Sequence, residues 1–332
     1  MAARLTISTA QGWLTSLPTA TVTMSFVTDV PNRFDKASAS EFARSAPTRV
    51  LAALALGLQW LVARLPWAVQ RGAGALAGRI AARVASRRST IVDENLATAF
   101  PDWSQSRRDA LRNRHFRELG IGIAQVGMAW WAGDRRLARL VDIEGLEHLP
   151  TGPDAPATLL VSGHFTTLDL CARAISLYAP VDLVHRALGE PAADAVTRWR
   201  RGRFAARLVD KRPARAIVAS QRERRTVWNA LDQADPTSGA VEAPFFGRPA
   251  LTNTTASRLA GRHGACVLPV CCVRTPDGRF RVRIEPPLEG FGHDVTADAS
   301  RLNAIVEQHA RATPEQYFWI HRRFKRERSS AA

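Results

Sequence analysis

The chain has few of the residues that mark several common protein classes. Among 332 residues there are four cysteines, and none of them forms a CxxC pair or takes the Cys/His spacing of a zinc site. We therefore expect no metal centre, and we expect Cys171, Cys266, Cys271 and Cys272 to be buried, reduced thiols. No stretch has the apolar length of a multi-span membrane protein. A GxSxG motif is also missing, so the common serine-nucleophile signature is excluded.

Lysine is scarce as well, since only Lys36, Lys211 and Lys325 occur and arginine supplies nearly all of the positive charge. The formal net charge of +16 attracts polyanions: nucleic acid, an anionic membrane surface, phosphorylated ligands or an acidic partner protein. The sequence has no helix-turn-helix spacing, zinc finger or RNA-recognition motif. We expect no nucleic-acid partner, and a basic nucleic-acid-binding protein is kept as the alternative from another functional class.

The chain divides by composition into three parts. Residues 1–45 are rich in Ser, Thr and Ala, show no periodicity and lack the ordered features of a signal peptide, so we expect a poorly ordered extension. Residues 46–90 are expected to form a membrane-associated helical segment, and residues 91–328 a catalytic domain.

The membrane-associated segment is too short to predict a crossing. Residues 50–67 are apolar, but a glutamine, an arginine and a proline interrupt them, whereas a spanning helix needs roughly 20 apolar residues. We expect this helix to lie in the interface, with Trp60 and Trp67 at headgroup level. The following residues 71–88 alternate arginines with Ala, Leu and Ile in a helical pattern, which favours an anionic bilayer surface. An ordinary pair of core helices is the alternative.

The rest of the chain alternates strand and helix patterns. Strands are expected at 157–163, 181–188, 266–273 and 279–286, and helices within 102–132, up to residue 177, and over 192–207 and 214–231. This alternation predicts an α/β fold whose sheet is covered by helices, without internal repeats.

The sharpest local feature is SGHFTTLDL, residues 162–170, which places His164 in the turn after a strand and Asp169 in the next helix. Reactive groups commonly sit at the carboxyl ends of strands in open α/β sheets. A carboxylate on one ring nitrogen fixes the tautomer and leaves the other nitrogen as a base. We predict that His164 is a general base oriented by Asp169. A structural His and Asp at this spacing is the alternative, because HxxxxD alone is a weak pattern.

Two further clusters are candidates for substrate binding. Phe245 and Phe246, followed by Arg248, are typical of a turn on a hydrophobic rim, although a loop that only packs would show the same residues. Arg186 lies at the end of an expected strand, and Arg201 belongs to a basic cluster around Trp199. The arginine fork matches phosphate and carboxylate oxygens, while a solvated helical face is the alternative.

Taken in order, these stretches resemble the bacterial lipid A biosynthesis acyltransferases, the late acyltransferases that act on Kdo-bearing precursors. The resemblance covers about residues 50–326 and rests on NLATAFP, HF, MAWW, IEGLEHL, GHFTTLDL, HRALGEP, PFFGRP, GACVLPV, RIEPPLE and PEQYFWIHRRFK. It implies a glycerolipid acyltransferase-like fold, with a mixed, mainly parallel sheet flanked by helices and an N-terminal membrane-associated helix. It also implies an enzyme of lipopolysaccharide biosynthesis at the bacterial inner membrane, with its catalytic domain on the cytoplasmic side.

The resemblance further implies the reactants and the site. A thioester of acyl carrier protein or coenzyme A would donate the acyl chain to a hydroxyl of a lipid A precursor, without a metal or bound cofactor. His164 and Asp169 match the HxxxxD dyad, Arg186 and Arg201 match arginines near the site, and Asp232 matches an acidic substrate-site residue. A lysophospholipid, ornithine lipid or glycolipid acceptor is the alternative within this enzyme class.

Overall fold

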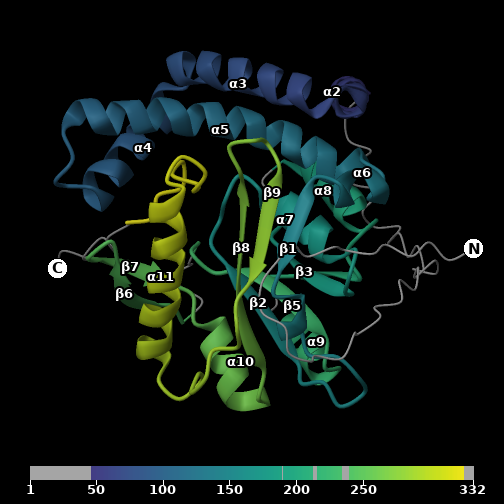
Figure 1. Ribbon diagram of the computed structural model, residues 1–332, viewed down its shortest axis with the longest axis vertical. Coiled ribbons are helices and arrows are strands. Elements are labelled where there is room, and N and C mark those ends of the chain that lie inside the picture. The colour runs from purple at the N-terminus through teal and green to yellow at the C-terminus, as the bar shows by residue number, and fades with distance from the viewer. Residues whose placement is uncertain (1–45, 189, 212–214, 234–238, 325–332) are drawn as a thin grey trace, which may run out of the picture. The chain divides into compact units, whose positions relative to one another are not determined.

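The computed structural model describes residues 46–188, 190–211, 215–233 and 239–324, and the predicted extension at 1–45 lies outside this part (Figure 1). The strands are β1 (Val141–Glu144), β2 (Thr158–Ser162), β3 (Val181–His185), β4 (Arg207–Asp210), β5 (Thr226–Ala230), β6 (Val241–Phe245), β7 (Arg248–Thr252), β8 (Cys266–Arg274) and β9 (Phe280–Ile284). The helices are α2 (Ala46–Arg64), α3 (Trp67–Val84), α4 (Ser86–Ala99), α5 (Gln105–Trp131), α6 (Asp134–Ala138), α7 (Leu168–Ile175), α8 (Pro191–Arg201), α9 (Arg215–Arg222), α10 (Thr255–His263) and α11 (Val295–Ala312), with a 3₁₀ turn at Leu146–His148.

Seven strands form one mixed sheet in the order β1-β9-β8-β2-β5-β3-β4. Strands β8, β2, β5, β3 and β4 are parallel to one another, whereas β9 is antiparallel to β8 and β1 pairs parallel with β9. The predicted α/β class with a mainly parallel sheet is therefore confirmed. The carboxyl ends of five strands meet at one edge, which is where open α/β sheets place their sites.

Each face of the sheet has its own apolar core, because successive side chains of a strand point to opposite faces. Leu160 of β2 packs in a cluster with residues of α5 and α7, whereas Leu159 and Val161 pack in another with residues of α9 and α10. All five residues of β2 are buried, as expected for a strand covered on both faces. Helices thus flank the sheet on both sides.

Two predicted helices were wrong at their C-terminal ends. The helix expected over 214–231 ends at Arg222, and β5 follows as the strand TVWNA in the middle of the sheet. The helix expected over 192–207 stops at Arg201, after which β4 forms the sheet edge. The helical spacing of apolar residues ran on into these short strands, and the β-branched and aromatic residues of β5 fit a strand better than a helix.

The long helix α5 is held against α3 by close backbone contact, and the two lie side by side in Figure 1. A methyl group on Gly120 would come within 2.1 Å of the Gly74 carbonyl oxygen and 2.6 Å of the Gly78 nitrogen. Only glycine permits this approach, so the glycines in the sequence GAGALAG of α3 allow α3 to pack closely against α5.

Helices α2 and α3 nevertheless leave large apolar side chains in solvent. The exposed set comprises Leu54, Leu58, Trp60, Leu61, Leu65, Val69, Leu76, Ile80 and Val84. No helix within the described residues has the length and apolar content that a membrane crossing requires. Trp67 is half-buried, since its ring packs on Phe280 and its Nε1 donates to the Gly278 carbonyl at 2.7 Å. Its placement at headgroup level stays a prediction.

Candidate active site

His164 and Asp232 meet because they follow two adjacent parallel strands. His164 lies two residues after β2, and Asp232 two residues after β5, while Ser162 and Ala230 are register partners. The Leu231 amide donates to the Ser162 carbonyl at 3.0 Å and keeps the strand ends together. Gly163 leaves room for this approach, since a methyl group there would lie 2.6 Å from Val306 and 3.4 Å from Asp232.

The Asp232 carboxylate is buried and receives three hydrogen bonds. His164 donates to it twice, through Nδ1 and through its backbone N–H at 2.9 Å, and the Tyr317 hydroxyl donates at 2.8 Å. Burial raises the pKa of Asp232, but the charge of His164 and its hydrogen bonds outweigh burial and hold that pKa well below its usual range. Asp232 is therefore an ionised acceptor.

This pairing determines which nitrogen of His164 can act as a base. An ionised carboxylate accepts a hydrogen bond from Nδ1–H, so the neutral imidazole carries its free lone pair on Nε2. The His164 side chain keeps 23% of its surface exposed while Asp232 keeps 4%, so the base is accessible and its partner is not. A buried carboxylate can also stabilise the imidazolium that forms when Nε2 takes a proton.

The prediction that Asp169 orients His164 by a direct contact was wrong. Asp169 lies in the first turn of α7, and Arg201 donates to its two carboxylate oxygens from Nε at 2.6 Å and from Nη2 at 2.8 Å. Burial raises the pKa of Asp169, but the charge and hydrogen bonds of Arg201 outweigh burial and keep that pKa below its ordinary value. Both carboxylate oxygens of Asp169 thus accept hydrogen bonds from the Arg201 guanidinium.

Two backbone N–H groups beside the imidazole already have acceptors within the protein. The backbone N–H of His164 donates to Asp232, and that of Thr166 donates to the Gln316 carbonyl at 2.9 Å. Arg201 lies at the end of α8 with Nη1 3.5 Å from the Nδ1 of His185. Nη1 is thus the guanidinium nitrogen of Arg201 that does not donate to Asp169.

The aromatic residues predicted at a substrate rim are in the core. Phe245 and Phe246 flank the β6–β7 turn, where Phe246 takes a positive φ of 51° followed by Gly247 at 68°. Both rings are buried in a cluster with Tyr317 and Trp319, whose ring centroids lie 5.9 Å from Phe245 and 5.7 Å from Phe246 respectively. The packing interpretation is confirmed for this turn. Through Tyr317 the cluster supports the carboxylate that holds His164.

The remaining candidates lie at the surface. Arg248 begins β7 and Arg186 follows β3, and both are exposed. Sequence reasoning did not single out Tyr317, although it stands inside the terminal stretch PEQYFWIHRRFK. The signal available in the sequence was the rarity of tyrosine, since the chain has only two.

The described residues give little support for a metal site or a reactive cysteine. Within the described residues no three His, Cys, Asp or Glu side chains gather to hold a metal ion. All four cysteines are free; Cys171 and Cys272 are buried and the other two half-buried. Burial raises the pKa of Cys171 and Cys271, so both remain neutral thiols at ordinary pH.

Known proteins match the chain along most of its length. The family model described as bacterial lipid A biosynthesis acyltransferase matches residues 39–326. A lipid A biosynthesis lauroyltransferase from Escherichia coli strain K12 is 34% identical over 82% of this chain and 90% of its own length. A lipid A biosynthesis palmitoleoyltransferase from the same organism is 33% identical over 81% of this chain and 89% of its own.

A solved structure is more distant. The 1-acyl-sn-glycerophosphate acyltransferase of Thermotoga maritima is 14% identical with a TM-score of 0.35, over 71% of this chain and 99% of its own, a likeness too weak to carry an argument. The family model and the two Escherichia coli enzymes decide against the nucleic-acid-binding alternative. The chain belongs to the bacterial lipid A biosynthesis acyltransferase family, a family of O-acyltransferases.

Proposed function

We propose that the protein transfers a fatty-acyl chain from a thioester of acyl carrier protein or coenzyme A to a hydroxyl of a lipid A precursor. The observation that carries the proposal is the pair formed by His164 and Asp232, in which a buried ionised carboxylate fixes the tautomer of an accessible imidazole. Family membership supports the lipid A acceptor, and the geometry supports the identity of the base.

The reaction needs no covalent enzyme intermediate. Nε2 of His164 takes the proton as the acceptor hydroxyl oxygen attacks the thioester carbonyl carbon. The tetrahedral intermediate collapses, the carbon–sulfur bond breaks, and the imidazolium returns its proton to the leaving thiolate. An ester and a free thiol result, with Asp232 stabilising the imidazolium between the two transfers.

Asp169 and Arg201 act together in this proposal. Because Asp169 holds the guanidinium bidentately, Arg201 keeps one orientation near the strand ends, from which it can interact with the oxyanion or a donor phosphate. Arg186 and Arg248, both exposed, are proposed contacts for anionic substrate groups. Phe245 and Phe246 contribute indirectly, by packing against Tyr317.

The enzyme is proposed to work at the cytoplasmic face of the bacterial inner membrane. The exposed apolar row of α2 and α3 suits insertion into the acyl-chain boundary, and arginines of the same helices suit anionic headgroups. The net charge of +16 also favours an acidic carrier protein as donor.

The test is acyl transfer by purified protein in detergent, with a lipid A precursor and an acyl carrier protein thioester. His164→Ala is expected to lower the rate by roughly 10²–10⁴-fold, as for loss of a positioned base. His263→Ala is the matched control, because His263 is exposed at the end of α10. Normal transfer by His164→Ala would disprove the mechanism. Transfer only to a lysophospholipid, ornithine lipid or glycolipid would instead disprove the acceptor and leave the base unchallenged.

A further inference from the structure

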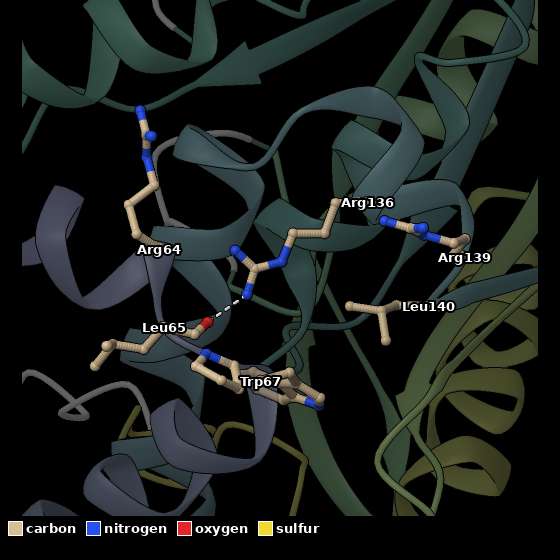
Figure 2. A pocket seen from close by; sticks show the side chains of 7 residues that line it. Arg64, Leu65, Trp67, Arg136, Arg139 and Leu140 are labelled. Atoms are coloured by element: carbon tan, nitrogen blue, oxygen red, sulfur yellow. Dashed lines mark hydrogen bonds between the residues drawn. The ribbon is translucent and has the colours of Figure 1, made fainter.

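A shallow pocket of about 490 Å³ lies where α2 ends and α3 begins, and His164 is not among its lining residues (Figure 2). Its apolar floor includes Leu65, Trp67 and Leu140, and three guanidinium-bearing side chains line it, those of Arg64, Arg136 and Arg139. Among the residues that the structure describes, no acidic side chain lines the pocket. A pocket of this volume suits a small ligand, and its chemistry is that of an anion with an apolar tail.

Two of the arginines that line the pocket contact neutral groups of α2. Arg136 donates to the carbonyl oxygens of Ala63 and Leu65 at 2.6 and 2.5 Å, which ties it to the end of α2 without neutralising it. Figure 2 shows the Arg136 guanidinium turned to the Leu65 carbonyl, the Arg139 side chain extending in the direction of Arg136, and Arg64 extending away from both. The Arg64 guanidinium lies over the ring of Trp60, 4.4 Å from its centroid.

The carboxylate of Asp142, close to Arg139 in the chain, pairs with an arginine outside the pocket. Asp142 accepts from Arg279 at 2.7 and 3.1 Å, and Arg279 donates in turn to the backbone carbonyl of Arg139 at 2.8 Å. Within the described ranges the Arg139 side chain has neither a hydrogen bond nor an ion pair. Two neighbouring cations without an anion attract a ligand that supplies one.

The pocket shares an edge of the sheet with the active site. Trp67, in its floor, donates to the carbonyl of Gly278, which lies in the turn between β8 and β9. That turn follows the carboxyl end of β8, and β8 runs parallel to β2, whose carboxyl end leads to His164. The exposed apolar residues Leu61, Leu65 and Val69 continue from the pocket along α2 and α3.

We propose that this pocket binds the phosphate-bearing headgroup of an anionic membrane phospholipid, separately from the acyl acceptor at His164. The guanidinium groups of Arg136 and Arg139 receive the phosphate, and the glycerol and upper acyl carbons lie on Leu65, Trp67 and Leu140. The apolar floor and its continuity with the exposed row favour a lipid over an acidic protein. A bound lipid would hold the edge that carries His164 against the bilayer surface.

The test uses the full chain in a zwitterionic detergent, titrated calorimetrically with dihexanoyl phosphatidylglycerol below its micelle concentration. Arg139→Gln is expected to weaken binding roughly tenfold, since it removes a charge-assisted contact. Arg135→Gln is the matched control, on the short helix α6 that Arg139 directly follows. It removes the same charge from an exposed side chain that does not line the pocket, so binding should stay within about twofold. His164→Ala should bind like the unaltered protein, so that failure of the catalytic proposal leaves this result unaffected.

Three outcomes would overturn the proposal. Equal losses from Arg139→Gln and Arg135→Gln would show a general charge effect. Inorganic phosphate that binds as tightly as the lipid would show a free-anion site. A loss of acyl carrier protein binding in Arg139→Gln, with lipid binding unchanged, would identify a carrier-docking surface.

Discussion

At the scale of single residues, the proposed chemistry depends on which carboxylate serves the imidazole. Asp232 accepts from Nδ1 of His164, and Asp169 accepts from Arg201. Both aspartates carry a lowered pKa, so charge alone does not distinguish them. Their partners do, and each therefore predicts a different kinetic effect of substitution.

Asp232→Asn is expected to lower acyl transfer by roughly 10²–10⁴-fold, because an amide stabilises neither the required tautomer nor the imidazolium. Asp169→Asn should lower the rate less, because Asp169 contacts Arg201 and not the imidazole. Acyl transfer rates of the two variants, measured side by side, check this difference. A normal rate in Asp232→Asn together with a large loss in Asp169→Asn would restore Asp169 as the orienting carboxylate.

His115 predicts a pH dependence of stability rather than of rate. It is fully buried, and burial lowers its pKa to about 4, against a backbone hydrogen bond to the Glu315 carbonyl that raises it. The unfolded chain therefore binds a proton that the folded protein does not bind between about pH 6.5 and 4. Above this window His115 does not lower the free energy of unfolding. As the pH falls through the window, the free energy of unfolding decreases.

We expect this loss to reach about 2 kcal/mol of unfolding free energy near pH 5 relative to pH 7.5. His115→Gln, which keeps a donor for the carbonyl, should be less stable at pH 7.5 and lose less on acidification. Denaturant unfolding at the two pH values measures the difference. An equal loss in both proteins would show that His115 is not the titrating group.

At the scale of elements, the contact between α3 and α5 depends on glycines. A methyl group at position 120 would lie 2.1 Å from a carbonyl oxygen of α3, so the helices would have to separate. Because α5 also packs on the sheet through Met128 and Ala129, any separation shifts α3 or α5 relative to the sheet.

Gly120→Ala is accordingly expected to destabilise the protein by about 1–3 kcal/mol, the usual cost of overpacking. Gly72→Ala on α3 is the control, because a methyl group there meets nothing within 4 Å. The control should stabilise the helix by roughly 0.5–1 kcal/mol. Thermal unfolding distinguishes the two, and a Gly120→Ala protein as stable as the control would contradict the close packing.

Secondary structure could be predicted from the sequence where one residue pattern was dominant. The buried strands at 158–162 and 266–274 and the long helix at 105–131 follow from apolar runs and helical periodicity. The short strands β1, β4 and β5 were missed, because four or five residues show no distinct period and their place is decided by pairing within the sheet. The β6–β7 hairpin was predicted only as a turn.

At the scale of the whole molecule, membrane binding is expected to combine apolar insertion with charge. Leu76 and Ile80 of α3 are 58% and 53% exposed, as part of the row on α2 and α3. Tyr178 is 44% exposed and lies between α7 and β3, at the sheet edge opposite His164. These side chains allow a matched comparison.

Leu76→Ser with Ile80→Ser is expected to lower partition into phosphatidylglycerol vesicles by roughly tenfold or more, since each buried large apolar side chain contributes about 1.5–3 kcal/mol. Tyr178→Ser should partition like the unaltered protein. High salt should weaken all three by screening the arginines. Vesicle flotation measures the bound fraction, and an effect of Tyr178→Ser equal to that of the double variant would place the membrane contact elsewhere.

The sequence by itself determined the chemical class of this protein: a histidine after a buried strand, an arginine-rich surface, an apolar N-terminal segment and ordered motifs shared with one enzyme family. The tertiary structure decided which groups meet. Asp169 is five residues from His164 in the chain, yet a local spacing does not determine where a helix points its side chains. Asp232 is 68 residues away, and it reaches His164 because hydrogen bonding sets β5 beside β2 with their carboxyl ends in register. Neighbouring strands in a sheet are chosen by the packing of the whole core, which no single stretch of residues encodes.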